Sequence, residues 1–122
     1  MHISNQDISE LVDRFYEAAR ADDVLGPIFE THVGDWPSHI QKMNSFWLTV
    51  ATGIPAYKGT PMQAHMSIGQ LRPEHFAIWL KLFYETTAAL FDAEKAHHFN
   101  TKAERIAESL KLGLNFRDNV LA

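Results

Sequence analysis

The chain is organised around Thr60-Pro61-Met62-Gln63-Ala64-His65-Met66-Ser67-Ile68-Gly69. Thr60 and Pro61 predict the start of a short helix, with the threonine as N-cap and the proline at the first helical position. Gly69 predicts its end after one or two turns. Because so short a helix is not stable alone, something outside the local backbone must hold it. Its one imidazole, on His65, is the chemically distinctive group in this stretch.

The composition is that of one soluble globular domain spanning residues 1–122. Hydrophobic residues make up 46% and charged residues 21%, which excludes a disordered chain. A net charge of -4 argues against nonspecific nucleic-acid binding, which needs a basic face. The sequence has no apolar run of the roughly 18 residues that a membrane span requires. Its first residues lack the basic and apolar regions of a signal peptide, so a cytoplasmic protein is expected.

The chain contains no cysteine but seven histidines. The absence of cysteine excludes disulfides, thiolate nucleophiles, iron–sulfur clusters and covalent haem attachment through Cys-x-x-Cys-His. Histidine is therefore the strongest ligand for a transition metal that the sequence offers, with carboxylates beside it.

Helical periodicity runs through most of the chain and no convincing strand pattern interrupts it. The first helix is expected to start at Ser4, where Ser4 and Asp7 have capping-box spacing, and to end at Asp22-Asp23. A short turn or corner is expected at Val24–Phe29, which contains Gly26-Pro27 and delivers Phe29 inward.

Three longer segments complete this pattern. A helix capped by Asp35 or Trp36 carries an apolar face as far as Val50. A loop rich in glycine and proline precedes the His65 stretch, and Pro73 then opens a strong helix that continues to Leu90. A last helix is expected from about Ala93 through Leu112. The fold class is therefore all-α, with four main helices and short irregular connections.

A set of motifs, in order and with compatible spacing over nearly the whole chain, resembles the group III truncated haemoglobins. The motifs are Phe15-Tyr16, Leu25-Gly26-Pro27-Ile28-Phe29, Trp36-Pro37-Ser38-His39, Phe46-Trp47, Tyr57-Lys58-Gly59-Thr60-Pro61, His65 and Trp79-Leu80-Lys81-Leu82-Phe83. The glycine–glycine motifs typical of groups I and II are not evident, which favours the third group. This resemblance implies a truncated globin fold, a two-over-two helical sandwich that encloses a non-covalent haem b.

The resemblance also implies roles for individual residues. His65 matches the proximal iron ligand, and three residues match the distal side, where a gas ligand binds: Tyr16, His39 and Trp79. Further haem contacts are expected from Phe29, Met43, Phe83 and Arg72. Arg72 and Lys58 are also candidates to pair with the haem propionates.

The chemistry of the distal residues suits a polar gas ligand. Dioxygen carries partial negative charge when it binds ferrous haem, and the Tyr16 O–H and the Trp79 N–H can both donate to it. His39 has three possible roles: to donate to the ligand, to swing as a gate, or to occupy the sixth coordination site itself. A packed polar group at the pocket rim is the plain structural alternative for His39.

His75 is the rival to His65 as iron ligand, because it starts the long helix one turn before Trp79. It is ranked second because the first turn of a helix tends to face solvent and because the resemblance selects His65. The remaining histidines, His2, His32, His97 and His98, are expected on the surface.

The functional prediction is a haem protein that binds dioxygen, nitric oxide or carbon monoxide, as a monomer or weak dimer. Turnover, such as nitric oxide dioxygenation or peroxidase-like chemistry, is left open. It would need a separate reductase, since no Gly-x-Gly-x-x-Gly motif is present. Two alternatives remain: a haem-free helical interaction module, and a carboxylate–histidine metal bundle. The bundle is disfavoured because it needs Glu-x-x-His motifs on two helices, and the sequence does not supply such a pair.

Overall fold

The computed structural model describes residues 1–57 and 71–121, with side chains up to Leu114. These residues form five helices and no strand, which confirms the all-α fold class. The helices are α1 (Asn5–Ala21), α2 (Leu25–His32), α3 (Trp36–Thr52), α5 (Pro73–Leu90) and α6 (Ala93–Leu121).

The first helix begins at the capping box that its sequence predicts. The Asp7 backbone N–H donates to Ser4 Oγ, and the Ser4 backbone N–H donates to an Asp7 carboxylate oxygen, both at 3.0 Å. Asp22 ends α1 and starts α2, because its carboxylate accepts from the backbone N–H groups of Val24 and Leu25 at 2.9 Å. One acidic side chain thus fixes the corner between the two helices.

The corner expected at residues 24–29 is longer than predicted, because α2 continues to His32. Pro27 lies in the first turn, where the backbone N–H has no helical partner to lose. Gly26 allows α2 to approach α1 closely, since a Cβ there would lie 2.6 Å from the carbonyl oxygen of Arg20. Phe29 is half-buried and packs against the core, so its predicted inward direction is confirmed.

The third helix has well-defined ends. At its start Asp35 is the N-cap and accepts from the Ser38 backbone N–H at 3.2 Å. At its end Gly53 adopts the left-handed conformation, with φ +81°, which favours glycine. Its fully buried residues, Trp47 and Ala51, both lie in the C-terminal half.

The last helix runs to Leu121, so the predicted end near Leu112 was wrong. Gly113 lowers helix propensity by about 1 kcal/mol but does not break a helix, and no proline follows. The buried stripe of α6 includes Phe99, Ala103 and Leu110, as its spacing predicts.

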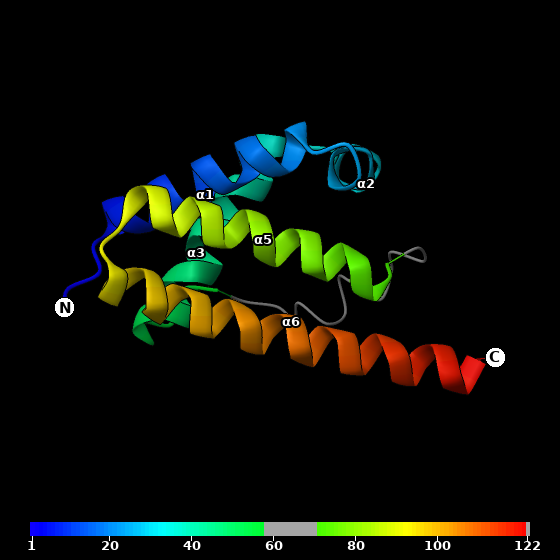
Figure 1. Cartoon of the computed structure of the whole chain (residues 1–122). Helices are drawn as coiled ribbons and strands as arrows, with labels where there is room; N and C mark the ends of the chain where they lie inside the picture. The colour runs from blue at the N-terminus through cyan, green and yellow to red at the C-terminus, as the bar shows by residue number, and fades with distance from the viewer. Residues whose placement is uncertain (58–70, 122) are drawn as a thin grey trace.

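Two helix pairs form the fold, with α1 and α3 over α5 and α6 (Figure 1). Helices α5 and α6 lie side by side, and α2 packs at the end of α1. Buried residues form two clusters. The larger includes Tyr16, Trp47 and Phe83, and the smaller is Phe76, Ala107, Leu110 and Leu114. Among the described residues, no helix has the length and apolar character needed to cross a membrane.

Candidate functional site

A cavity of about 500 Å³ is lined by residues of both core clusters and by all five described helices. This volume lies in the range of sites that hold a small molecule or cofactor. The lining residues are Phe15, Tyr16, Leu25, Ile28, Phe29, His32, Val33, Gly34, Asp35, Ser38, His39, Lys42, Met43, Phe46, Trp47, Tyr57, Leu71, His75, Phe76, Trp79, Ile106, Ala107 and Leu110. Most of them are apolar or aromatic.

Tyr16 lies on the cavity side of α1 and is 7% exposed. Its ring contacts Phe29 and His39 edge-on, with centroid separations of 5.5 and 5.2 Å. Burial raises the pKa of the Tyr16 phenol well above its ordinary value, because the phenolate would lose its hydration. The hydroxyl therefore keeps its proton at neutral pH and can act as a donor.

Helix α3 brings His39 and Met43 to the same cavity, one helical turn apart. His39 is half-buried between two rings, edge-on to Tyr16 and to Trp36 at centroid separations of 5.2 and 5.6 Å. The structure thus places His39 directly beside Tyr16, as the distal assignment of both residues requires.

Trp79 on α5 lines the same cavity as Tyr16 and His39. It is edge-on to Phe15 and stacked on Phe83, at centroid separations of 5.5 and 5.4 Å. Phe83 itself is 1% exposed and does not line the cavity; it lies behind Trp79 and also stacks on Trp47. Its expected haem contact is not visible in the cavity wall and stays a prediction.

His75 is half-buried and lines the cavity, so the expectation that it faces solvent was wrong. Its Nδ1 accepts from the backbone N–H of Arg72 at 3.1 Å. A neutral imidazole carries one proton, which must then lie on Nε2. A protonated nitrogen has no lone pair for a metal, so His75 in this arrangement is a donor and not an iron ligand.

Arg72 is exposed as the N-cap of α5 and does not line the cavity. Its predicted haem contact therefore also stays a prediction. Instead, Lys42 and His32 line the cavity and provide basic groups there. Sequence reasoning missed Lys42, although it follows His39 by three residues and so shares that helix face. His65 and Lys58 lie outside the described residues.

The surface assignment of the other histidines is wrong in one case. His98 is half-buried, and its Nε2 lies 2.9 Å from the carbonyl oxygen of Ala51, so it links α6 to the end of α3. His2, His32 and His97 are exposed, as predicted. No group of three or more potential metal ligands occurs among the residues that the structure describes.

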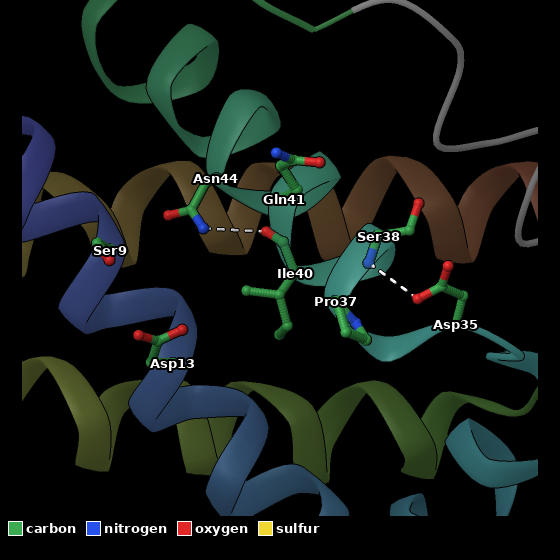
Figure 2. Close-up of a pocket in the computed structure, with 8 residues that line it drawn as sticks. All are labelled: Ser9, Asp13, Asp35, Pro37, Ser38, Ile40, Gln41 and Asn44. Carbon is green, nitrogen blue, oxygen red and sulfur yellow. Dashed lines mark hydrogen bonds between the residues drawn. The ribbon is translucent and has the colours of Figure 1, made fainter.

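A second, polar hollow lies on the outside of the molecule, between α1 and the first turns of α3. Figure 2 shows Ser9 and Asp13 on α1 beside Ile40 on α3, with the Asp35–Ser38 cap at the far side. Asp35 and Ser38 line both this hollow and the cavity, so only the start of α3 separates the two. The hollow gathers no ring donors and is open to solvent.

The chain belongs to the bacterial-like globin family, whose model matches residues 4–112. It is therefore a haem globin by family. Its expected resemblance to the group III truncated haemoglobins is confirmed by a group 3 truncated haemoglobin of Campylobacter jejuni. That protein is 34% identical over 109 residues, which cover 86% of each chain.

The fold agrees with this relationship. The crystal structure of a group III truncated haemoglobin from Campylobacter jejuni matches with a TM-score of 0.88 and 32% sequence identity. The match covers 93% of this chain and 92% of that one. The truncated globin fold expected from the sequence is therefore confirmed.

Proposed function

We propose that this protein binds haem b non-covalently in the cavity and holds a diatomic gas beside Tyr16, His39 and Trp79. The observation that carries the proposal is the convergence of these three ring donors, from three helices, on one cavity of about 500 Å³. Family membership supports the haem, and the geometry supports the position of the donors.

The cavity suits a flat, largely apolar macrocycle with charged carboxylates at one edge. Aromatic and aliphatic side chains supply most of its surface, and basic groups on Lys42 and His32 can balance the carboxylates. The haem cannot be attached through thioether bonds, because the chain has no cysteine. The donor set and the apolar lining therefore both fit the group.

His65 is the proposed proximal ligand. Each half-buried histidine among the described residues is engaged elsewhere: His75 Nδ1 with Arg72, His98 with Ala51, and His39 among the distal rings. This distribution supports the family-based assignment of His65.

Bound haem would supply an iron atom with a free coordination position and two oxidation states. The role of this chain's own side chains is to donate hydrogen bonds to the partly negative gas. Tyr16 can do so across the physiological range, since burial raises the pKa of its phenol. Trp79 has only an N–H and can act only as a donor. Each such bond is worth about 0.5–1.5 kcal/mol, which slows dissociation roughly two- to tenfold.

The physiological gas and any turnover go beyond binding. Dioxygen, nitric oxide and carbon monoxide all fit the site, and three donors would also assist nitric oxide dioxygenation or peroxide chemistry. Repeated turnover would need electrons from a separate reductase. A cytoplasmic location and a monomer or weak dimer are part of the same proposal.

An absorption spectrum tests the proposal against the haem-free interaction module. Purified protein with one equivalent of haem should show a Soret band that shifts when carbon monoxide is added to the reduced form. A folded helical protein that takes up no haem under these conditions would overturn the proposal.

A further inference from the structure

Trp36, the first residue of α3, lies directly behind the distal residues. Its ring is edge-on to Tyr16 and His39, at centroid separations of 5.9 and 5.6 Å, and tilted against Phe29 at 6.1 Å. Trp36 does not itself line the cavity. It therefore touches three cavity residues without being placed to contact a ligand.

Arg20 covers this indole from the outside. Its guanidinium carbon lies 4.1 Å from the centroid of a Trp36 ring, within the range of a cation–π interaction. The same guanidinium pairs with Glu30, at 3.3 Å from Nη2 to Oε1. Side chains from α1, α2 and α3 thus form one clamp, Glu30–Arg20–Trp36, on the outer side of the distal residues.

The start of α3 depends on this packing. The buried residues of α3 are confined to its C-terminal half, and its first turns are held by the Asp35 cap and by partly buried side chains, Trp36 among them. Trp36 Nε1 is buried and has no hydrogen-bond partner among the described residues. Among the described residues, the contacts that orient the indole are those with the rings of Tyr16, Phe29 and His39 and with the Arg20 guanidinium.

We propose that Trp36, clamped by Arg20 and Glu30, is a positioning residue for Tyr16 and His39. An exposed ion pair thereby sets how well these two cavity-lining rings are aimed at the gas ligand. This inference rests on the proposed haem function, since it concerns the strength of hydrogen bonds to that ligand. Because Arg20 and Glu30 are exposed, salt weakens their pairing.

Trp36 could instead pass electrons to or from the cavity, but its surroundings fit this role less well than the positioning role. Removing an electron from the indole would place positive charge beneath the Arg20 guanidinium. The two like charges would repel each other, and the buried N–H has no described acceptor for its proton.

The test uses the haem-loaded protein and two measurements. The C–O stretching frequency of the ferrous carbon monoxide complex reports the polar donors around the ligand, and stopped-flow mixing gives the dioxygen dissociation rate. Trp36→Leu should shift and broaden the C–O band and speed dissociation by about two- to tenfold, the effect of weakening one hydrogen bond. Arg20→Met keeps the apolar stem and should speed dissociation about two- to fivefold.

Matched variants separate positioning from general destabilisation. Arg14→Met removes an exposed arginine from the same helix, and Ile8→Val trims the core of α1 away from the cavity. Both should keep the wild-type C–O band and dissociation rate. Raising the salt concentration should move wild-type protein toward the Arg20→Met rate and leave the variant unchanged.

Wild-type C–O frequency and dissociation rate in both haem-loaded Trp36→Leu and Arg20→Met would overturn this inference alone. Should Trp36→Leu not fold, Arg20→Met decides the matter, because it alters only an exposed side chain. Failure of the wild-type protein to bind haem would instead overturn the proposed function.

Discussion

The cavity is bounded by two unlike sets of residues. The donor wall comprises Tyr16, Phe29, His39, Met43 and Trp79, and the apolar wall comprises Leu71, Phe76, Ile106, Ala107 and Leu110. In the donor wall each polar ring is held edge-on by other aromatic rings. The apolar wall belongs to or packs against the smaller core cluster. Under the proposed function, the donor wall would bind the polar gas ligand and the apolar wall would contact the haem.

The largest effect is expected from replacing His65, the proposed iron ligand. His65→Gly should remove the axial bond, so that haem is retained weakly or only when imidazole is added. His75→Ala, at the edge of the apolar wall, should leave the absorption spectrum close to wild type, because the Arg72 N–H on Nδ1 keeps the proton of the neutral ring on Nε2. Visible titration of both variants with haem provides the measurement.

The opposite pattern would contradict the assignment. If His75→Ala abolished haem binding and His65→Gly did not, His75 would have to give up its bond to Arg72 and act as the ligand itself.

A smaller effect is expected from replacing His39, the donor-wall residue that lies near the start of α3. His39→Leu should change carbon monoxide association more than dissociation, by a few-fold. It should also flatten the pH dependence of association between about pH 5 and 8, where imidazoles change charge. Flash photolysis across this range measures both. If the association rate and its pH profile were both unchanged in His39→Leu, His39 would not act as a gate. Tyr16 and Trp79 would then remain as the proposed donors.

The smallest effect is expected from replacing Asp7, which belongs to neither wall of the cavity. The Ser4 backbone N–H and the Lys95 ammonium lower the pKa of Asp7. The Asp7 carboxylate lies 2.9 Å from Lys95 Nζ, and this ion pair joins the starts of α1 and α6. A lowered carboxyl pKa gives stability that is present above the unfolded value of about 4 and lost as pH falls through the folded value.

Asp7→Asn removes the charge that pairs with Lys95 and should therefore cost up to about 1 kcal/mol of unfolding free energy at neutral pH, the upper end for a surface ion pair. The difference from wild type should shrink under acid. Urea unfolding at several pH values measures this, and ligand dissociation rates should not change. A pH-independent difference would show that the cost does not come from the charge.

Local signals in the sequence predicted most of this fold. The Ser4–Asp7 box and the Asp35 cap each depend on residues three apart, so their geometry follows from helix formation itself. The common cavity for Tyr16, His39 and Trp79 was also predicted, because the family resemblance supplied the tertiary arrangement that periodicity lacks.

Contacts between distant residues were not predictable in this way. His98 was wrongly assigned to the surface. Its bond to Ala51 joins residues 47 positions apart, so no local pattern in the sequence predicts it. The Arg20 clamp on Trp36 depends on how α1 meets α3. The predicted end of the last helix near Leu112 was too early, because helical spacing alone does not mark where α6 ends. His75 was misplaced since a first-turn position does not determine which side of the helix faces a cavity.

The most direct test of the donor wall compares two gases in the Tyr16→Phe protein, which keeps the ring packing and loses the hydroxyl. Dioxygen dissociation should become roughly two- to tenfold faster, the worth of one hydrogen bond. Carbon monoxide is less polar when bound, so its dissociation should change much less. The same pattern is expected for Trp79→Phe. Equal acceleration of both gases would show that Tyr16 acts through its volume, and the account of a hydrogen-bonding donor wall would be wrong.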